Sequence, residues 1–290
     1  MDGVHGESRQ EQGTLYVVAT PIGNLEDITL RALKVLAGVD VIAAEDTRNT
    51  ATLLARHGIG KRPMALHAHN EARRAQQVVD WLHAGRSVAL VTDAGTPGLS
   101  DPGALVVAKA MAAGLCVTPI PGPAAAVAAY SASGLAGGRF LFYGFLPPKS
   151  PARRAAVKAL ADLECALIFH EAPHRVIDSV GDLAASLPGE RTIVIARELT
   201  KLFESIVSMP LAEAQAWLRA DANRQKGEFV LIVSGAGKAT DRTHTGWEAT
   251  LQRLLAELPL AQAVRLTCAV TGARRKPVYE RALATAQDRD

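Results

Sequence analysis

The sequence predicts an α/β protein made of two α/β domains followed by a small helical domain. Short, apolar, β-rich runs alternate with amphipathic stretches through the first 238 residues. This rhythm is typical of parallel strands that are connected by helices. Loops rich in Gly and Pro follow several runs, at the sheet edge where open α/β sheets bind their ligands. From Thr240 onward, leucines follow helical spacing instead.

The chain divides into five expected segments. They are a disordered tail (1–12), a first α/β domain (13–130), a hinge (131–139), a second α/β domain (140–238) and a helical domain (239–290). The tail is polar and lacks the apolar region of a signal peptide. The hinge sequence SASGLAGGR is small, glycine-rich and without periodicity.

Composition narrows the class of protein. The chain has 290 residues, 48% of them hydrophobic and 21% charged, which is typical of a soluble globular protein. No window approaches the run of about 18 apolar residues that a membrane span needs, so we expect a cytoplasmic protein with no membrane partner. The net charge of +3 is too small to diagnose nucleic-acid binding. Aromatic residues make up 4%, which disfavours a stacking platform for single strands.

The three cysteines, Cys116, Cys165 and Cys268, are far apart and lie in apolar or periodic segments. They predict buried free thiols in a reducing compartment rather than disulfides or a zinc site. His67 and His69 are two residues apart, and we expect no metal site there.

The first α/β domain begins with a strand at 15–19 and a turn at 20–24. Asp27 is expected to cap the next helix. A second strand at 39–44 runs into the charged residues 45–49, which are costly at a strand end unless they are solvated or used. A helix at 50–57 then stops at Gly58.

The segment from 87 to 103, SVALVTDAGTPGLSDPG, is the most informative of this domain. A buried strand at 88–91 enters a Gly/Pro-rich loop that is longer than most βα connections, and long ordered loops are often functional. An ordinary βα connection is the alternative. We expect Asp101 to cap the following helix, with Pro102 as its first residue and Gly114 as its end.

The second half repeats the rhythm with different loops, and its strands predict a mixed sheet. We expect these strands at 140–145, 165–169, 192–196, 204–209 and 229–233. In the tail, a helix that starts near Trp247 is broken at Pro259, and a second helix ends at Gly272. A last short helix follows the basic cluster 274–276.

Three loops of the first half suit a small ligand that carries a nucleoside. They lie at 20–24, 93–100 and 121–126, and their Gly and Pro residues let backbone groups face a ligand closely. The carboxylate of Asp93 can accept a ribose hydroxyl or an amino group. The chain has neither GxGxxG nor GxxxxGK[ST], which weakens dinucleotide-binding and P-loop interpretations.

Eight motifs then occur in order: TPIGNLEDITLRAL, AEDTRNT, DAGTPGLSDPG, IPGPAA, GFLPPK, EAPHR, ARELTK and GEFVLIVSG. Together they resemble the ribosomal RNA small-subunit methyltransferase I family of the tetrapyrrole-methylase-like superfamily. The resemblance covers about residues 13–235 and is weaker in the tail. His170 and Ala172 replace a common Tyr and Ser, and Pro148 replaces a frequent basic residue.

The resemblance implies two α/β domains of the tetrapyrrole-methylase type (class III methyltransferases), S-adenosylmethionine bound between them, and a homodimer. The implied reaction is 2′-O-methylation of a cytidine ribose in 16S ribosomal RNA near the decoding centre, on the assembled 30S subunit. It also implies a set of cofactor-binding residues: Pro21, Ile22, Asp93, Gly95, Thr96, Ser100, Ala124, Ala125, Phe169 and Glu228. Taken alone, Ile22, Ala124 and Ala125 are better explained as core packing.

Methyl transfer from a sulfonium is an in-line displacement that needs no metal, and a carboxylate, lysine or imidazole can help to remove the hydroxyl proton. The first catalytic candidates are Glu45, Asp46, Arg48, Arg197, Glu198 and Lys201. A wider set on loops expected to face the cleft is His69, Glu71, Glu171, His174 and Glu204. The alternative for both leading groups is a structural ion-pair network at a domain or dimer interface.

Basic residues are the candidates for contact with the RNA backbone. They are Arg175, Lys149, Arg153, Arg274, Arg275 and Lys276. The alternatives are a salt bridge near a helix cap for Arg175 and solvated surface charge for the others. Two competing functions remain at this point: a methylase of a tetrapyrrole precursor, and a non-catalytic RNA-binding or ribosome-assembly factor.

Overall fold

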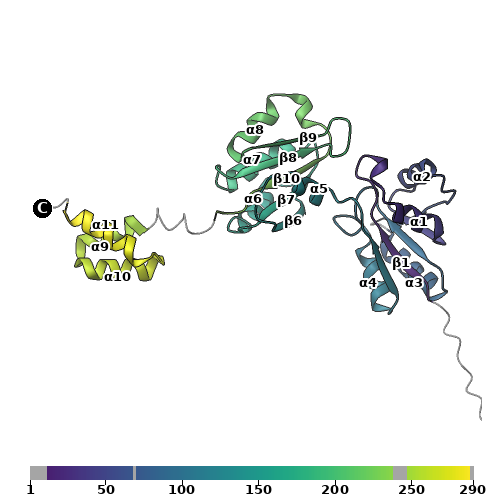
Figure 1. Ribbon diagram of the computed structural model, residues 1–290, viewed down its shortest axis with the longest axis horizontal. Helices are drawn as coiled ribbons and strands as arrows, with labels where there is room; N and C mark the ends of the chain where they lie inside the picture. The colour runs from purple at the N-terminus through teal and green to yellow at the C-terminus, as the bar shows by residue number, and fades with distance from the viewer. Residues whose placement is uncertain (1–11, 68–69, 238–246, 288–290) are drawn as a thin grey trace, which may run out of the picture. The chain divides into compact units, whose positions relative to one another are not determined.

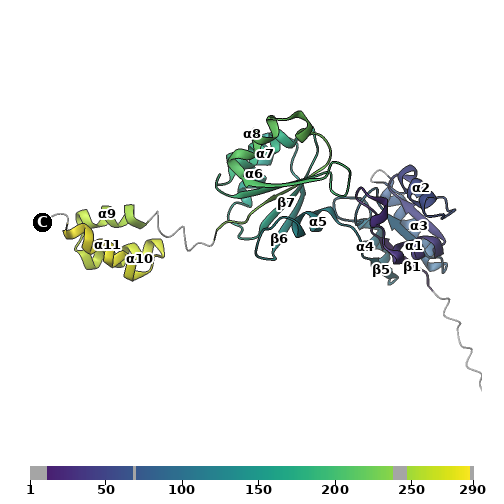
Figure 2. The ribbon, with the colours of Figure 1, turned by 45° about the horizontal axis from the view of Figure 1, so that its top comes forward.

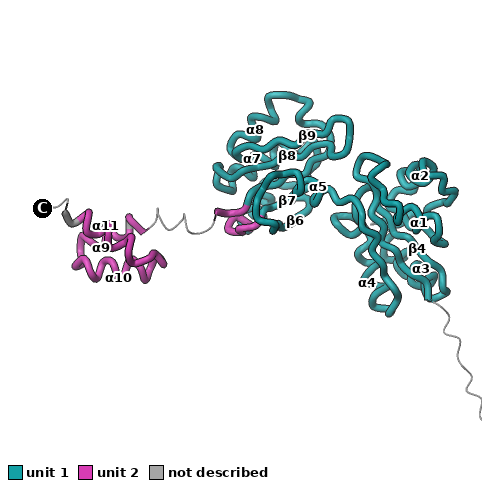
Figure 3. The backbone as a smooth tube through the Cα atoms, in the orientation of Figure 1, with its two compact units in different colours: residues 1–159, 166–234 teal, residues 160–165, 235–290 magenta. Residues whose placement is uncertain are grey.

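The computed structural model describes residues 12–67, 70–237 and 247–287. These residues fall into two compact units, which Figure 3 shows in different colours. The first unit comprises the described residues up to 159 together with residues 166–234. The second comprises residues 160–165 and the described residues from 235 onward. Most of the predicted disordered tail lies outside the described residues.

The first sheet of the first unit is entirely parallel. Its strands are β1 (Thr14–Val18), β2 (Val41–Ala44), β3 (Met64–Ala65), β4 (Val88–Val91) and β5 (Cys116–Ile120). They lie in the order β3-β2-β4-β1-β5, with parallel pairing throughout. Figure 1 labels β1 of this sheet. Because the strands are parallel, the loops after β1, β2, β4 and β5 meet at one edge of the sheet.

Helices cover both faces of this sheet. Four of them follow the first four strands: α1 (Leu30–Gly38), α2 (Thr47–Arg56), α3 (Glu71–His83) and α4 (Ala104–Ala112). The helices α1 and α2 bury Leu36 and Leu54 in one apolar cluster. The helices α3 and α4 bury Leu82 and Val106 in another. All four residues of β4 are buried, as expected for a central parallel strand.

Asp27 and Asp101, which the sequence predicted as N-caps of the helices after β1 and β4, do not occupy those positions. Thr29 caps α1, with its hydroxyl accepting the Ala32 N–H at 3.1 Å, because the short 3-10 helix η1 (Leu25–Asp27) occupies the position of Asp27. The helix α4 begins at Ala104 rather than at Pro102. Its first N–H groups, those of Gly103 and Leu105, donate to the carboxylate of Glu71 on α3, at 2.8 and 3.2 Å.

The second sheet is mixed, as predicted. Its strands are β6 (Phe140–Phe145), β7 (Ala166–Glu171), β8 (Thr192–Arg197), β9 (Ser205–Pro210) and β10 (Phe229–Val233), in the order β6-β7-β10-β8-β9. The strands β6 and β7 pair in parallel, and the other neighbours pair antiparallel. The helices associated with it are α6 (Ser150–Ala159), α7 (Val176–Ser186) and α8 (Leu211–Arg219), which Figure 2 labels. The 3-10 helix η2 (Ala222–Gln225) follows α8 in the chain.

The helix α5 (Ala125–Ser131) joins the first half to the second sheet. Its buried residues Ala126 and Ala129 pack in one apolar cluster with Ile168 of β7, Val194 of β8 and Ile232 of β10. By chain order, α5 falls in the first α/β domain of the sequence-based division. Its packing therefore ties the loop after β5 to the second sheet.

The second unit contains three helices among its described residues: α9 (Trp247–Glu257), α10 (Leu260–Thr271) and α11 (Arg275–Gln287). They share a core that includes Trp247, Leu251, Val264 and Val278. The break at Pro259 and the end at Gly272, whose φ is 71°, are as predicted. Arg275 and Lys276 do not precede α11 but form its first turn.

The expectation of buried thiols is wrong. Cys116 is exposed, and Cys165 and Cys268 are half-buried. Cys116 begins β5, which pairs on one side only and therefore leaves an open edge. Among the described residues all three cysteines are free.

No helix within the described ranges is long and apolar enough to cross a membrane.

Candidate functional site

A cavity of about 610 Å³ lies in the first unit, where the loops of the first sheet meet the second sheet. Ile22 follows β1, Glu45 follows β2, and the loop after β4 contributes Asp93 and Asp101. These residues stand at the carboxyl edge of the sheet, where the sequence places the ligand loops. The remaining lining residues are Ala94, Gly95, Thr96, Leu99, Ala124, Ala125, Ala126, Val127, Phe140, Phe142, Phe145, His170, Glu171, Ala172, Pro173, Leu199, Glu228, Phe229 and Val230.

The three ligand loops predicted from the sequence are bonded to one another. Thr20 and Gly95 exchange both of their backbone hydrogen bonds, at 2.9 and 3.0 Å. Gly95 has a φ of 81°, a conformation that favours glycine. The Thr96 hydroxyl donates to the carbonyl of Pro123 at 3.0 Å. The loops after β1, β4 and β5 therefore form one connected wall of the cavity.

Three carboxyl groups, those of Glu45, Asp93 and Asp101, line the first-sheet side of the cavity. The Asp93 N–H donates to Glu45 Oε2 at 3.4 Å, and the Asp46 N–H donates to Asp93 Oδ1 at 3.0 Å. Burial raises the pKa of Glu45, and the negative charges of Asp93 and Asp46 add to the effect. The cavity thus has an acidic side.

Asp101 is a lining residue that the sequence reasoning missed as part of the site. Burial, followed by the charges of Glu45 and Asp93, raises the pKa of Asp101 to about 6. The sequence signal was its place in SDPG at the end of the central loop, which equally suited a helix cap. The cap is supplied instead by Glu71, so Asp101 is left at the cavity.

Aromatic rings form the opposite side of the cavity. The ring of His170 lies 4.9 Å from that of Phe142 and 5.6 Å from that of Phe145, both in edge-to-face geometry. Burial lowers the pKa of His170, which favours its neutral form. Phe169 is fully buried and does not line the cavity. Successive residues of a strand point to opposite faces, so one step along β7 separates His170 from Phe169.

Of the first group of catalytic candidates, Glu45 alone lines the cavity. Asp46 is the N-cap of α2, and its carboxylate accepts the Arg48 N–H at 2.8 Å. The Arg48 guanidinium bonds the same carboxylate at 2.6 Å and leaves most of its side chain exposed. These hydrogen bonds lower the pKa of Asp46 to about 2. The pair therefore stabilises the start of a helix.

The second group of candidates forms a turn at the cavity margin. Lys201 Nζ lies 3.0 Å from both Glu198 Oε1 and Glu228 Oε2, and Glu228 lines the cavity. The Arg197 guanidinium donates to the carbonyls of Phe203 and Lys226 at 3.0 and 3.2 Å. The chain that leaves β8 is thus held in place by local charged groups.

This turn also holds the first ligand loop. The Asn24 N–H donates to Thr200 Oγ1 at 3.0 Å. A Cβ added at Gly23 would lie 2.6 Å from Lys201 Cγ and 2.7 Å from Thr200 Oγ1, so this position requires glycine. Thr200 itself has a φ of 65°. The contact positions Ile22 in the cavity wall through its neighbours.

Two of the basic residues expected to bind RNA are engaged inside the protein. Arg153 is 3% exposed, pairs with Asp182 at 2.7 Å and donates to the carbonyl of Pro148 at 3.1 Å. Arg175 donates to the carbonyl of Leu146 at 2.6 Å and pairs with Glu171 at 3.2 Å. Both guanidinium groups support the loop after β6. Lys149 on that loop is exposed, as are Arg274, Arg275 and Lys276 in the second unit.

The other sequence candidates are placed as follows. Pro21 is buried within the first loop, Ser100 is exposed with a φ of 73°, and neither lines the cavity. His174 is exposed, and the Glu204 carboxylate accepts the Thr200 N–H at 2.5 Å. His69 lies outside the described residues. Within the described ranges, no group of three or more His, Cys, Asp or Glu side chains is arranged to hold a metal ion.

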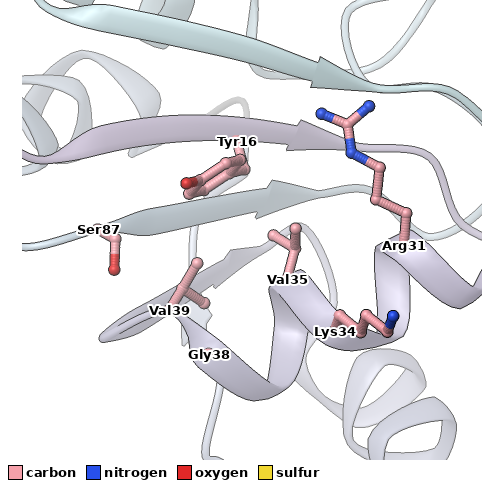
Figure 4. Close-up of a pocket in the computed structure, with 7 residues that line it drawn as sticks. All are labelled: Tyr16, Arg31, Lys34, Val35, Gly38, Val39 and Ser87. Atoms are coloured by element: carbon pink, nitrogen blue, oxygen red, sulfur yellow. The ribbon is translucent and has the colours of Figure 1, made fainter.

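A second hollow, of about 350 Å³, lies at the opposite edge of the first sheet. Figure 4 shows Arg31 and Lys34 on α1, with Tyr16 on β1 and Ser87 just before β4. This edge holds the amino ends of β2 and β4, away from the ligand loops. The larger cavity is therefore the candidate functional site.

Comparisons with known proteins support the fold and identify the family. The family model "Tetrapyrrole (Corrin/Porphyrin) Methylases" matches residues 14–215. The model "RsmI C-terminal HTH domain" matches residues 245–286. A solved uroporphyrin-III C-methyltransferase from Thermus thermophilus, complexed with S-adenosylhomocysteine, has a TM-score of 0.54 and 16% identity. That match covers 77% of this chain and 97% of that one, and it shows the fold.

Two curated relatives are much more similar in sequence. Ribosomal RNA small subunit methyltransferase I of Escherichia coli O157:H7 is 48% identical over 96% of this chain and 98% of its own. The protein of the same name from Vibrio cholerae is 50% identical over 92% of this chain and 93% of its own. The chain belongs to the ribosomal RNA small subunit methyltransferase I family, within the tetrapyrrole methylase fold.

Proposed function

We propose that this protein uses S-adenosylmethionine to methylate the ribose 2′-hydroxyl of a cytidine in small-subunit ribosomal RNA near the decoding centre. The observation that carries the proposal is the 610 Å³ cavity at the carboxyl edge of the first sheet. It occurs in a chain that is 48% identical, over nearly its whole length, to a ribosomal RNA small subunit methyltransferase.

The cavity's side chains suit this cofactor. S-adenosylmethionine supplies an electrophilic methyl group on a positively charged sulfonium. The carboxylates of Glu45 and Asp93 complement positive charge and accept hydroxyl or ammonium hydrogens. On the same wall Ala124 and Ala125 project no more than a methyl group, which leaves room for a bulky ligand. The residues proposed to hold the cofactor are Ile22, Asp93, Gly95, Thr96, Ala124, Ala125 and Glu228.

The aromatic side of the cavity suits nucleobases. Phe142, Phe145 and His170 offer ring faces and edges on which a planar base can stack. A nucleotide acted on at its ribose must be drawn out of its stack into the site, as in enzymes that work on single nucleotides. Catalysis then depends on orientation, and holding the reacting oxygen in line can lower the barrier by several kcal/mol, up to about 7–11.

The finer parts of the proposal concern substrate form and assembly. We take the substrate to be the assembled 30S subunit and the protein to act as a homodimer in the cytoplasm. Lys149 and the cluster 274–276 are exposed cations suited to phosphate contacts. These exposed groups replace Arg153 and Arg175 in this role, because the guanidinium donors of both arginines are already used by carbonyls and carboxylates.

The experiment is methyl transfer from labelled S-adenosylmethionine to small subunits that lack this modification, with free tetrapyrrole precursors as the competing substrate. We expect one labelled cytidine, resistant to alkaline cleavage at its 3′ side because its 2′-oxygen is blocked. Label in the tetrapyrrole, or binding of subunits with no transfer at all, would support the alternative enzyme or the assembly factor. A 2′-O-methylation map of ribosomal RNA from cells with and without the protein provides the independent check.

A further inference from the structure

Asp101 is a cavity residue for which neither the helix nor the cofactor set has a use. The sequence suggested that it caps α4, but Glu71 accepts the N–H groups at the start of that helix. Asp101 instead lies half-buried on the cavity wall beside Glu45 and Asp93. Its carboxylate is therefore available to whatever occupies the cavity.

Hydrogen bonding distinguishes Asp101 from its two acidic neighbours. Glu45 accepts the N–H of Asp93, and Asp93 accepts the N–H of Asp46. The bond from the Asp93 N–H opposes the burial that raises the pKa of Glu45. Among the described residues, no backbone N–H donates to the Asp101 carboxylate, and no lysine or arginine forms an ion pair with it. Of the three carboxylates, Asp101 is therefore the one that no backbone N–H of the described residues engages.

The other ionisable groups of the cavity are less suited to accept a proton. Glu171 is buried against Arg175, and Glu228 is paired with Lys201. Both carboxylates are therefore already engaged by a cation of the protein itself. The Nε2 atom of His170 is buried and has no hydrogen-bond partner among the described residues, while its ring packs between Phe142 and Phe145.

We propose that the carboxylate of Asp101 accepts the proton of the ribose 2′-hydroxyl during methyl transfer. This inference rests on the proposed function. In the step, the bond from the 2′-oxygen to the methyl carbon forms as the sulfur–methyl bond breaks. The electron pair of the broken bond stays on sulfur as a neutral thioether, and the hydroxyl proton passes to a carboxylate oxygen of Asp101. A cation and an anion thus become two neutral groups.

The environment of Asp101 matches this task. Burial and the negative charges of Glu45 and Asp93 raise the pKa of Asp101 to about 6. The group is then mostly ionised at neutral pH and still basic enough to take a proton, which is the useful range for a general base. Other charged groups act on Glu45 and Asp93 in turn. Asp46 raises and His67 lowers the pKa of Glu45, and the negative charge of Asp93 interacts with the Arg48 guanidinium.

The test compares Asp101→Asn, Asp101→Glu and the matched control Asp178→Asn in the full-length protein. Asp178 is an exposed carboxylate in the first turn of α7, outside the cavity lining. Single-turnover methylation of small subunits is measured from pH 5 to 9. The Kd for S-adenosylmethionine is measured by calorimetry. The titration of the aspartate carboxyl carbons is followed by NMR in protein without cofactor.

We expect the wild-type rate to rise with pH through about 6 and then to level off. Asp101→Asn should lose about 10²–10⁴-fold in rate, as is usual for a general base, and lose this acid limb. Its cofactor Kd should stay within threefold of wild type. Asp101→Glu should keep the limb with partial activity, and Asp178→Asn should behave as wild type. In the NMR titration, a resonance with a midpoint near 6 should be absent from Asp101→Asn alone.

Glu45→Gln provides a second readout. Removing one of the two facing negative charges should move the acid limb of the methylation rate to lower pH. The proposal is overturned if Asp101→Asn keeps the limb and a rate within threefold of wild type. It is also overturned if that variant loses cofactor binding, because Asp101 would then hold the cofactor. Failure of the proposed function looks different: wild-type protein that binds S-adenosylmethionine would methylate no small subunit at any pH.

Discussion

At the scale of single residues, the molecule shows how similar side chains acquire different tasks. Asp93 accepts a backbone N–H at the centre of the cavity wall. Asp182 accepts hydrogen bonds from Arg153, Arg154 and Ser150 in the interior of the second half. One carboxylate faces a ligand space and the other faces fixed cations. A change at each should therefore affect a different property.

Asp93→Asn is predicted to weaken cofactor binding. The substitution removes a negative charge that we propose to contact the cofactor, and hydrogen bonds to charged groups contribute about 1.5–3 kcal/mol. The Kd for S-adenosylmethionine, measured by calorimetry, should therefore rise about 10- to 150-fold. The free energy of unfolding should fall by less than in Asp182→Asn. An unchanged Kd would mean that the cofactor does not lie against this wall.

Asp182→Asn is predicted to destabilise the fold, by about 3–5 kcal/mol, because it leaves the buried Arg153 guanidinium without its counter-charge. Urea unfolding measures the loss, and Asp178→Asn on the same helix is the control, with an expected effect within about 0.5 kcal/mol. A loss no larger than that of the control would show that Arg153 finds another partner.

The pH dependence of the same variant has a definite sign. Burial by itself would raise the pKa of Asp182, but hydrogen bonds from Arg154, Ser150 and Arg153 outweigh it and lower the pKa in the folded protein. A lowered folded pKa stabilises the protein above the unfolded value, about 3.9, and this contribution is lost as the pH falls through the folded pKa. The gap between wild type and Asp182→Asn should therefore narrow below about pH 4.

At the scale of elements, the start of α4 connects stability to the site. Its helix dipole and free N–H groups are satisfied by Glu71, which belongs to α3. Gly103, just before the helix, has a φ of 126°, and a Cβ there would come within 2.8 Å of the Leu90 side chain. The loop that carries Asp93 and Asp101 is thus anchored at its far end by a side chain from another helix.

Glu71→Gln is predicted to weaken both the anchor and the cavity. Loss of the charged cap should lower the free energy of unfolding by about 0.5–2 kcal/mol, the usual range for N-caps. Because the cavity loop ends at this cap, the Kd for S-adenosylmethionine should also rise severalfold. Thr29→Ala removes the cap of α1, which the 3-10 helix η1 separates from the cavity residue Ile22, and should lower stability similarly while leaving that Kd unchanged. Equal Kd changes in both variants would indicate a general loss of stability.

At the scale of the whole molecule, the two compact units divide the expected tasks. The first holds the cavity, and the second has its own apolar core around Trp247 and Val264. The second unit also carries the exposed cations Arg274, Arg275 and Lys276 at the start of α11. We therefore expect RNA affinity and cofactor affinity to respond to different substitutions.

The double substitution Arg274→Ala/Arg275→Ala is predicted to weaken binding to ribosomal RNA without changing cofactor affinity. For each phosphate that is no longer neutralised, the slope of log K against log salt should become shallower by about 0.7–0.9. Filter binding across a salt series measures this slope. The matched control is Arg31→Ala/Lys34→Ala, which removes two charges from the smaller hollow. If the control reduces the slope as much, the effect reflects net charge and not this surface.

Several features followed from local sequence alone. The strand–loop–helix rhythm predicted the first sheet, and its Gly- and Pro-rich loops predicted the wall that contains Ile22, Asp93 and Thr96. Local sequence patterns gave wrong predictions where two nearby residues could each fill the same structural role, such as a helix cap or a position in the cavity lining. Asp27 and Thr29 are both good caps, and the short turn η1 decides between them. Phe169 and His170 differ by one step, and strand register decides which one meets the cavity.

The sequence by itself determined the order of the elements, the sheet edge that carries the candidate cavity and the family, because these depend on patterns within short stretches of chain. The tertiary structure decided which charged side chains remain available. Glu71 caps a helix that starts more than thirty residues later, and Arg175 bonds the carbonyl of Leu146. Such contacts join residues that are distant in sequence. Asp101 thereby remains at the cavity, while Arg153 and Arg175 are held by internal partners.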